Sequence, residues 1–212
     1  MKQIALISML AVLLAGCAII RKPAPVEPGV TNAGAWQARQ GSLRDFNIWS
    51  LQGRVATGQL LGWTGNLSWR QRSDDFNVRL AGPLGAGGFR ANGTLDRVII
   101  QTKDRRLVTT DPDALVEKSL GWSFPLEPLR YWAKGLPAPG DYDSISVDGT
   151  GHLTALKQRG WQLSYQEYTQ PEGAPDLPRR IVLDNGDTRI RLVVDRWFDL
   201  GAEQAASSQA GG

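Results

Sequence analysis

Alternation of apolar and polar residues with a period of two runs through most of this chain. It occurs in stretches near residues 49–55, 66–70, 76–80, 161–165, 181–183 and 190–194. Successive side chains of a strand point to opposite faces, so each stretch presents one face to an apolar interior and the other to water. Turn residues fall between stretches: Ser73, Asp74 and Asp75 predict one hairpin, and Asn185–Gly186, which tolerate positive φ, predict another. Residues 94–101 and 104–110 predict a further hairpin about Lys103–Asp104.

Three segments break the alternation and predict helices. Residues 35–47 carry apolar side chains near helical spacing. Asp111 is a suitable N-cap for a helix that continues to Leu120, and Gly121 suits a left-handed C-terminus. Residues 124–134 predict a second short helix. The pattern therefore predicts a mainly antiparallel sheet with inserted helices, an α+β arrangement, whose apolar face must curl over the helices or close into a barrel.

The N-terminus has the pattern of a bacterial lipoprotein signal. Lys2 precedes an apolar run over residues 4–14, and Leu14-Ala15-Gly16-Cys17 has the small residues and the cysteine of a lipobox. Cleavage would leave Cys17 as an acylated N-terminus, and acyl chains anchor through their buried methylenes. A plain signal peptide with an incidental cysteine, or a short membrane helix, are the alternatives. The lipobox is favoured because Cys17 is the only cysteine.

Composition divides the chain into four parts. Residues 1–16 are the predicted signal peptide, and residues 17–34, rich in proline and glycine, the acylated N-terminus and a flexible tether. Residues 35–199 are the predicted folded domain, and residues 200–212 a disordered tail. Position 18 is Ala rather than the Asp that usually retains lipoproteins in the inner membrane. We therefore expect anchoring through Cys17 on the periplasmic face of the outer membrane.

The sequence offers little for catalysis. The net charge of +3 is weak and widely spread, which argues against nucleic-acid binding and permits only loose attraction to anionic surfaces. His152 is the only histidine, and we expect it to be a surface strand residue without a catalytic or metal-binding partner. No Gly-x-Ser-x-Gly elbow is present, and the glycine-rich stretch 82–88 lacks the Lys-Ser/Thr of a phosphate loop. We expect no enzyme, cofactor or metal, and a monomer.

Two apolar features suggest contact with lipid. The stretch Gly82-Pro83-Leu84-Gly85 would place an uncharged leucine at the tip of a hairpin loop, where it could enter a bilayer or a partner's groove, or fold back onto the core. The chain also has eight tryptophans, all in the predicted domain. Most are expected to pack in the core, although a curved sheet lined by them could enclose an apolar cavity.

A series of short motifs, in this order and spacing, resembles the LolB family of outer-membrane lipoprotein receptors over nearly the whole mature chain. The motifs are Cys17, Gly53-Arg54-Val55, residues 67–71 (LSWRQ), 79–85 (RLAGPLG), 120–126 (LGWSFPL), 129–137 (LRYWAKGLP), 160–165 (GWQLSY) and 177–179 (LPR). The tail after Leu200 departs from the family pattern.

The resemblance implies an incomplete, strongly curved antiparallel barrel that encloses an apolar cavity covered by helices. That cavity would accept the acyl chains of lipoproteins from a periplasmic carrier, LolA, and release them to outer-membrane lipid. The family's protruding leucine maps onto Leu84. Strand parity and helix faces predict the following cavity residues: Leu51, Val55, Leu67, Trp69, Val78, Leu80, Leu126, Leu129, Trp132, Leu163 and Leu192. A structural envelope lipoprotein that binds a protein partner and no lipid is the alternative, and an envelope hydrolase is a third hypothesis.

Overall fold

The computed structural model describes residues 29–58, 62–83, 88–94 and 96–201. Eleven strands form one sheet in the order β6-β5-β4-β3-β2-β1-β11-β10-β9-β8-β7, and all neighbouring pairs are antiparallel. The strands are β1 Ile48–Thr57, β2 Thr64–Arg72, β3 Asp75–Ala81, β4 Gly88–Thr94, β5 Arg97–Gln101, β6 Arg106–Thr109, β7 Ser144–Val147, β8 Leu153–Gln158, β9 Trp161–Thr169, β10 Leu177–Asp184 and β11 Arg189–Phe198.

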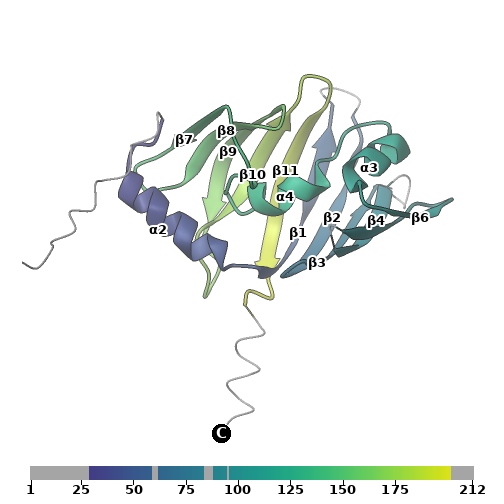
Figure 1. Cartoon of the computed structure of the whole chain (residues 1–212), viewed down its shortest axis with the longest axis horizontal. Coiled ribbons are helices and arrows are strands. Elements are labelled where there is room, and N and C mark those ends of the chain that lie inside the picture. Colours follow the sequence, from purple (N-terminus) through teal and green to yellow (C-terminus); the bar gives the residue numbers. More distant parts are fainter. Residues whose placement is uncertain (1–28, 59–61, 84–87, 95, 202–212) are drawn as a thin grey trace, which may run out of the picture.

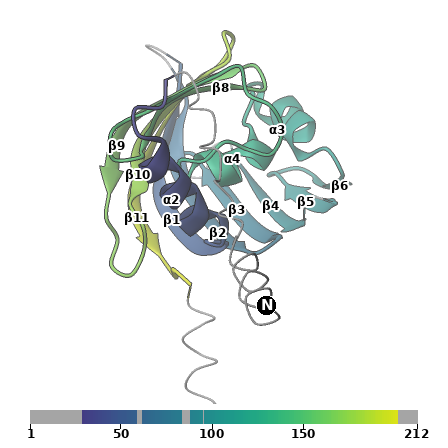
Figure 2. The same cartoon turned by 60° about the vertical axis from the view of Figure 1, so that its left-hand side comes forward.

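The sheet curves strongly and holds three helices against its concave face (Figures 1 and 2). The helices are α2 Ala33–Arg44, α3 Pro112–Leu120 and α4 Leu126–Trp132. Strands β6 and β7 end the order on opposite sides, so the sheet stays open. This confirms the predicted fold class, an incomplete barrel with inserted helices.

The alternation seen in the sequence becomes the two faces of the sheet. In β2 and β3, Leu67, Trp69, Val78 and Leu80 are buried while the residues between them are exposed or partly exposed. The register places Leu67 opposite Leu80 and Trp69 opposite Val78, so the buried side chains form continuous rows across the strands. Gly53 lies at a bulge between β1 and β11, where a Cβ would come within 2.4 Å of the Val193 carbonyl oxygen. A side chain there would push the strands apart.

The helix signals work as predicted at α3. Asp111 accepts a hydrogen bond from the Ala114 amide at 3.1 Å, and Gly121 ends the helix with a φ of 77°.

The strand predictions were less complete. The sequence pattern missed β4 and β7, and the stretch predicted as one strand over 94–101 divides between the end of β4 and β5. Strand β4 contains three of its seven residues as Gly or Asn, which weakens its alternation.

The predicted start of the domain at residue 35 was wrong, because residues 29–34 belong to the fold. Val30 forms a β-bridge with Val147 and is only 8% exposed. Asn32 caps α2 by accepting a hydrogen bond from the Ala35 amide at 3.1 Å. At the other end, the Gly201 amide donates to the Ile48 carbonyl, so the fold also extends past the predicted boundary. The bridge at Val30 and the hydrogen bond of Gly201 are made by backbone groups, which composition does not reveal.

Helix α4 is fixed in the concavity by a buried glutamine of the sheet. The Gln158 side chain, fully buried, accepts hydrogen bonds from Trp132 Nε1 and the Ala138 amide, both at 2.9 Å. Its amide group donates to the carbonyls of Ala138 and Asp141. The Tyr165 hydroxyl adds a bond to the Trp132 carbonyl at 3.0 Å. Every hydrogen-bonding position of Gln158 is thus used.

Replacing Gln158 with Leu should lower the free energy of unfolding by about 4 kcal/mol, because buried polar groups around it would lose their partners. Urea denaturation followed by tryptophan fluorescence would measure this loss. Gln162→Leu, on the exposed face of β9, is the matched control and should change stability by less than about 0.5 kcal/mol. Equal effects of the two changes would contradict the role given to Gln158.

Candidate functional site

The concave interior gathers all the residues that the sequence placed in an acyl-chain cavity. They come from β1, β2, β3, β9, β11 and α4, and none is more than 2% exposed. All belong to one hydrophobic cluster: Leu51, Val55, Leu67, Trp69, Val78, Leu80, Leu126, Leu129, Trp132, Leu163 and Leu192. In this conformation their side chains fill the interior, with α4 covering them. Their role in holding acyl chains stays a prediction.

Two charges, the half-buried Asp113 and the buried Lys134, connect the three helices into one cover. Asp113 of α3 accepts a hydrogen bond from the Glu127 amide of α4 at 3.1 Å, which caps a helix that has no cap of its own. Lys134, directly after α4, donates to the carbonyls of Leu43 and Phe46 at the end of α2, at 3.1 and 2.8 Å. A cation is favourable at a helix C-terminus and a carboxylate at an N-terminus.

Both charges lie where water is largely excluded, and their pKa values shift accordingly. Burial raises the pKa of Asp113 to about 6, and burial lowers the pKa of Lys134 to about 8. Each shift disfavours the charged form near neutral pH. The helices that cover the apolar interior are therefore joined by polar contacts whose charged groups lose part of their hydration on folding.

An aromatic group, the aromatic rim, lines the edge of the interior where β1, β3 and β5 end. It consists of Trp63, Phe89, Trp122 and Phe124. Trp63 directly precedes β2, and its ring centroid lies 5.8 Å from that of Trp122. Trp122 and Phe124 belong to the segment that joins α3 to α4. Trp63 and Trp122 are only partly buried, whereas the other six tryptophans are buried. The prediction that most tryptophans pack in the core is confirmed.

The stretch 82–88 begins beside this rim. Ala81 pairs with Gly88, which closes the base of the loop between β3 and β4. Gly88 has a φ of +116°, and a Cβ there would come within 2.2 Å of the Leu80 carbonyl oxygen, so the base needs glycine. Gly82 is buried, and Pro83 is exposed on the outer side of the sheet. Leu84 and Gly85 lie outside the described residues, and so does Cys17.

His152 has partners that the sequence did not reveal. Its ring stacks on Tyr168 at 4.1 Å, its Nε2 lies 3.1 Å from Asp176 Oδ2, and its Nδ1 lies 3.1 Å from Thr150 Oγ1. His152 is therefore partly buried rather than a surface residue, and the expectation that it lacks a catalytic or metal-binding partner stays a prediction. A nucleophilic threonine would have to donate its hydroxyl proton to the imidazole. The Thr150 hydroxyl instead donates to Asp148 at 2.7 Å. Arg39 of α2 covers the other part of Tyr168, and the cluster attaches α2 to the sheet.

Within the described residues, no group of three or more His, Cys, Asp or Glu side chains is arranged to hold a metal ion. The same residues contain no helix long and apolar enough to cross a membrane.

Comparison with known proteins identifies the family. The sequence profile of the family Outer membrane lipoprotein LolB matches residues 47–197. The chain belongs to the LolB family. The Outer-membrane lipoprotein LolB of Nitrosococcus oceani is 40% identical over 199 residues, which cover 92% of this chain and 96% of that protein. The LolB of Stutzerimonas stutzeri is 39% identical, with 89% of this chain and 91% of that protein covered.

Membership of LolB confirms the predicted family and the localisation as an outer-membrane lipoprotein. Among solved structures, a LolA superfamily protein from Nitrosomonas europaea aligns with a TM-score of 0.47 and 7% identity, over 77% of this chain and 91% of that one.

The raised pKa of Asp113 predicts a pH-dependent contribution to stability. The folded pKa, about 6, exceeds the ordinary value of 3.8, so folding favours the protonated form. The contribution of Asp113 to the free energy of unfolding should therefore increase, by up to about 3 kcal/mol, as the pH falls from 7 to about 4. Asp113→Asn keeps an oxygen acceptor for the Glu127 amide but removes the titration.

The variant should therefore be more stable than the parent at pH 7.5, and the difference should narrow by about 2 kcal/mol at pH 4.5. Urea unfolding at both pH values measures this difference. A difference that stays constant across the two pH values would show that Asp113 does not titrate between them.

Proposed function

We propose that this LolB protein receives acylated lipoproteins from a LolA-like periplasmic carrier and inserts them into the outer membrane. The observation that supports this most is the apolar interior of the half-barrel. It is bounded by an aromatic rim and lies beside the loop that carries Leu84. Such an interior matches the chemistry of acyl chains, and the transfer we propose makes or breaks no covalent bond.

The filled state of the interior suggests how cargo could be released as well as captured. Burial of an acyl chain is worth about 0.8 kcal/mol per methylene, so an open cavity would hold cargo very tightly. Here the chains must first displace α4 and its neighbours from the concave face, because the interior residues have almost no exposed surface. The free energy of that opening reduces the net affinity. The affinity of this protein for acyl chains can thus exceed that of the carrier and remain below that of the bilayer.

The entrance most consistent with this arrangement is the aromatic rim. Trp63 belongs to the sheet side of the rim and Trp122 to the segment between α3 and α4, so separating them would uncover Phe124 and the interior behind it. The loop base at Ala81 and Gly88 lies next to Phe89 of the same rim. Cargo leaving there would meet the membrane-directed loop first.

The filled interior also favours a second candidate, a structural envelope lipoprotein that binds a protein partner and no lipid. Transfer distinguishes the two. The chain beginning at Ala18 is mixed with the carrier loaded with an acylated lipoprotein, and the complexes are separated by size. We expect cargo to move to this protein. Cargo that stays on the carrier, with both proteins folded, would support the structural candidate.

Leu84→Glu tests the delivery step. The change should leave folding and cargo capture within about twofold of the parent, because position 84 falls in sequence between Ala81 and Gly88, the paired residues that end β3 and begin β4. Delivery to vesicles should fall at least about tenfold, since a charged side chain partitions poorly into hydrocarbon. Leu84→Met, which keeps an apolar side chain of similar length, is the control and should deliver normally. Loss of capture by the glutamate variant would contradict this division of roles.

Crosslinking tests the entrance. Trp63→Cys together with Trp122→Cys, joined by a short thiol-reactive crosslinker, should reduce cargo uptake at least about tenfold by holding the rim closed. Gln52→Cys with Ser68→Cys, a cross-strand pair within the sheet, is the control and should take up cargo normally when crosslinked. Normal uptake by the crosslinked rim would place the entrance elsewhere.

A further inference from the structure

Positive charge is concentrated in one part of the sheet rather than spread evenly as the sequence suggested. Residues 64–109 contain eight Arg and Lys but four Asp and no Glu, which gives +4, whereas the whole chain carries only +3. This stretch forms β2 to β6 and their connections. The rest of the chain is thus close to neutral, and the charge belongs to one side of the barrel.

Hairpin topology separates the charges further along the strands. The turns at 73–74 and 95–96 lie at one end of these strands, and the loop 82–87 and turn 102–105 lie at the other. Asp74, Asp75 and Asp96 all lie at the first end, where Arg70, Arg72 and Arg97 balance them. The end with the loop has the five cations Arg79, Arg90, Lys103, Arg105 and Arg106 against Asp104 alone.

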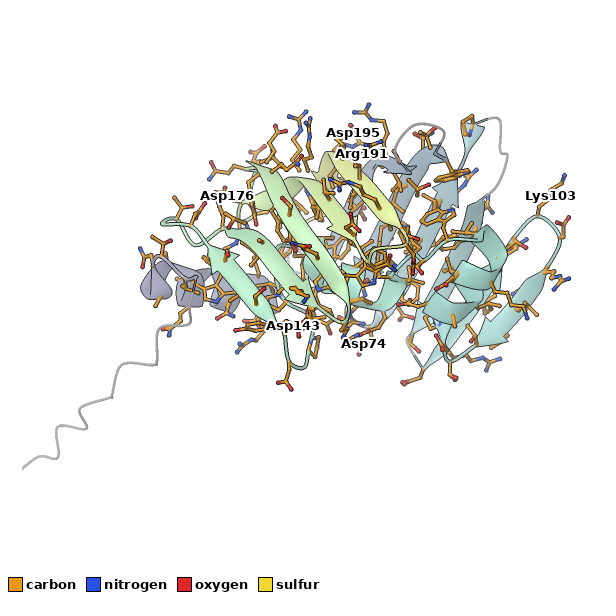
Figure 3. All side chains as sticks on the ribbon, turned by 90° about the horizontal axis from the view of Figure 1, so that it is seen from above. Asp74, Lys103, Asp143, Asp176, Arg191 and Asp195 are labelled. Atoms are coloured by element: carbon orange, nitrogen blue, oxygen red, sulfur yellow. The ribbon has the colours of Figure 1, made fainter. Side chains whose placement is uncertain are left out.

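Three of these cations line a shallow groove on the outer face of the sheet. The groove has a volume of about 410 Å³, and its lining includes Arg79, Arg90, Gln101, Thr102 and Lys103. Lys103 lies on the turn at one end of the molecule's long axis, whereas Asp176 lies toward the opposite end (Figure 3). Ala81 and Gly88, the base of the Leu84 loop, also line the groove. The groove therefore reaches the two paired residues between which the loop begins and ends.

The arginines of the groove repel each other and so reduce the stability of the fold. Arg79 pairs directly with Arg90 across β3 and β4, so their side chains leave the same face about 5 Å apart. Like charges in this position are destabilising. No carboxylate of the described residues forms an ion pair with Arg79, Arg90 or Lys103. An anion bound between them would remove the repulsion.

We propose that this groove binds the phosphate groups of anionic phospholipids at the membrane surface, beside the Leu84 loop. The inference rests on the proposed delivery of cargo to the membrane and adds a lipid headgroup site to it. Guanidinium groups bind phosphate with two parallel hydrogen bonds, and the side-chain amide of Gln101 supplies a further donor. The groove is open, and three of its nine lining residues are cationic while none is anionic, which suits an anionic headgroup.

Vesicle binding tests the groove. The chain from Ala18 onward contains every strand and the whole core, which begins at Val30. It is mixed with phosphatidylcholine vesicles, with or without 30% phosphatidylglycerol, and sedimented. We expect stronger binding to the anionic vesicles. Arg79→Ser with Arg90→Ser should reduce that partition about 25-fold, since each cation near an anionic surface contributes about fivefold.

Arg70→Ser with Arg97→Ser removes the same charge from the other end of the same strands and is the matched control. It should reduce the partition less than threefold, and thermal unfolding should verify that both variants fold. Equal losses in the two variants would overturn the groove in favour of diffuse attraction by net charge. Equal binding of the parent to both vesicles would overturn it as well.

The assay contains neither carrier nor cargo, so failure of the transfer experiment and failure of this one are separate results. A groove variant that binds anionic vesicles normally but no longer takes cargo from the carrier would also overturn the proposal. It would assign the groove to an acidic protein partner instead.

Discussion

An open antiparallel sheet with one apolar face is the constraint on which this structure depends. A closed barrel fills its own interior, but here β6 and β7 remain apart, and the inner face must be covered by something else. The helices provide that cover. Gln158, Trp132 and Tyr165 fix the end of α4 to β8 and β9, so the position of the cover follows from a few saturated hydrogen bonds as well as from apolar contact.

The cover combines strong apolar packing with contacts that are costly to bury. Asp113 and Lys134 join the helices through charge-assisted hydrogen bonds, yet each is desolvated enough to shift its pKa toward neutrality. Neither has an opposite charge beside it that would repay the whole desolvation cost. A cover built this way is well ordered when closed but less stable than one joined by apolar contacts alone. That balance suits a protein that we propose must open for cargo.

We propose that the two faces of the sheet bind different parts of lipid molecules. The inner face presents apolar rows for acyl chains, and the outer face presents arginines at the end where the Leu84 loop begins. Both faces come from the same strands, because alternation assigns odd and even positions to opposite sides. Arg79 and Leu80 are neighbours in sequence but belong to different proposed sites, one for headgroups and one for hydrocarbon.

The sequence by itself determined the period-two strands, the caps of α3, the family and which residues face inward. These features depend on local chemistry: the parity of a strand, the acceptor of Asp111, the backbone freedom of Gly121. The eleven predicted interior residues share one cluster because strand parity places eight of them on the inner face and the apolar face of α4 supplies Leu126, Leu129 and Trp132.

Only the tertiary structure decided what fills the interior and where charge gathers. Strands β4 and β7 take their places by pairing with neighbouring strands, and Val30 joins the fold through a bridge to a residue more than a hundred positions away. His152 beside Asp176 and Arg79 opposite Arg90 are closer in sequence, but their contacts also depend on how the segments that carry them are aligned. Register is set by the sheet as a whole rather than by any short stretch of sequence.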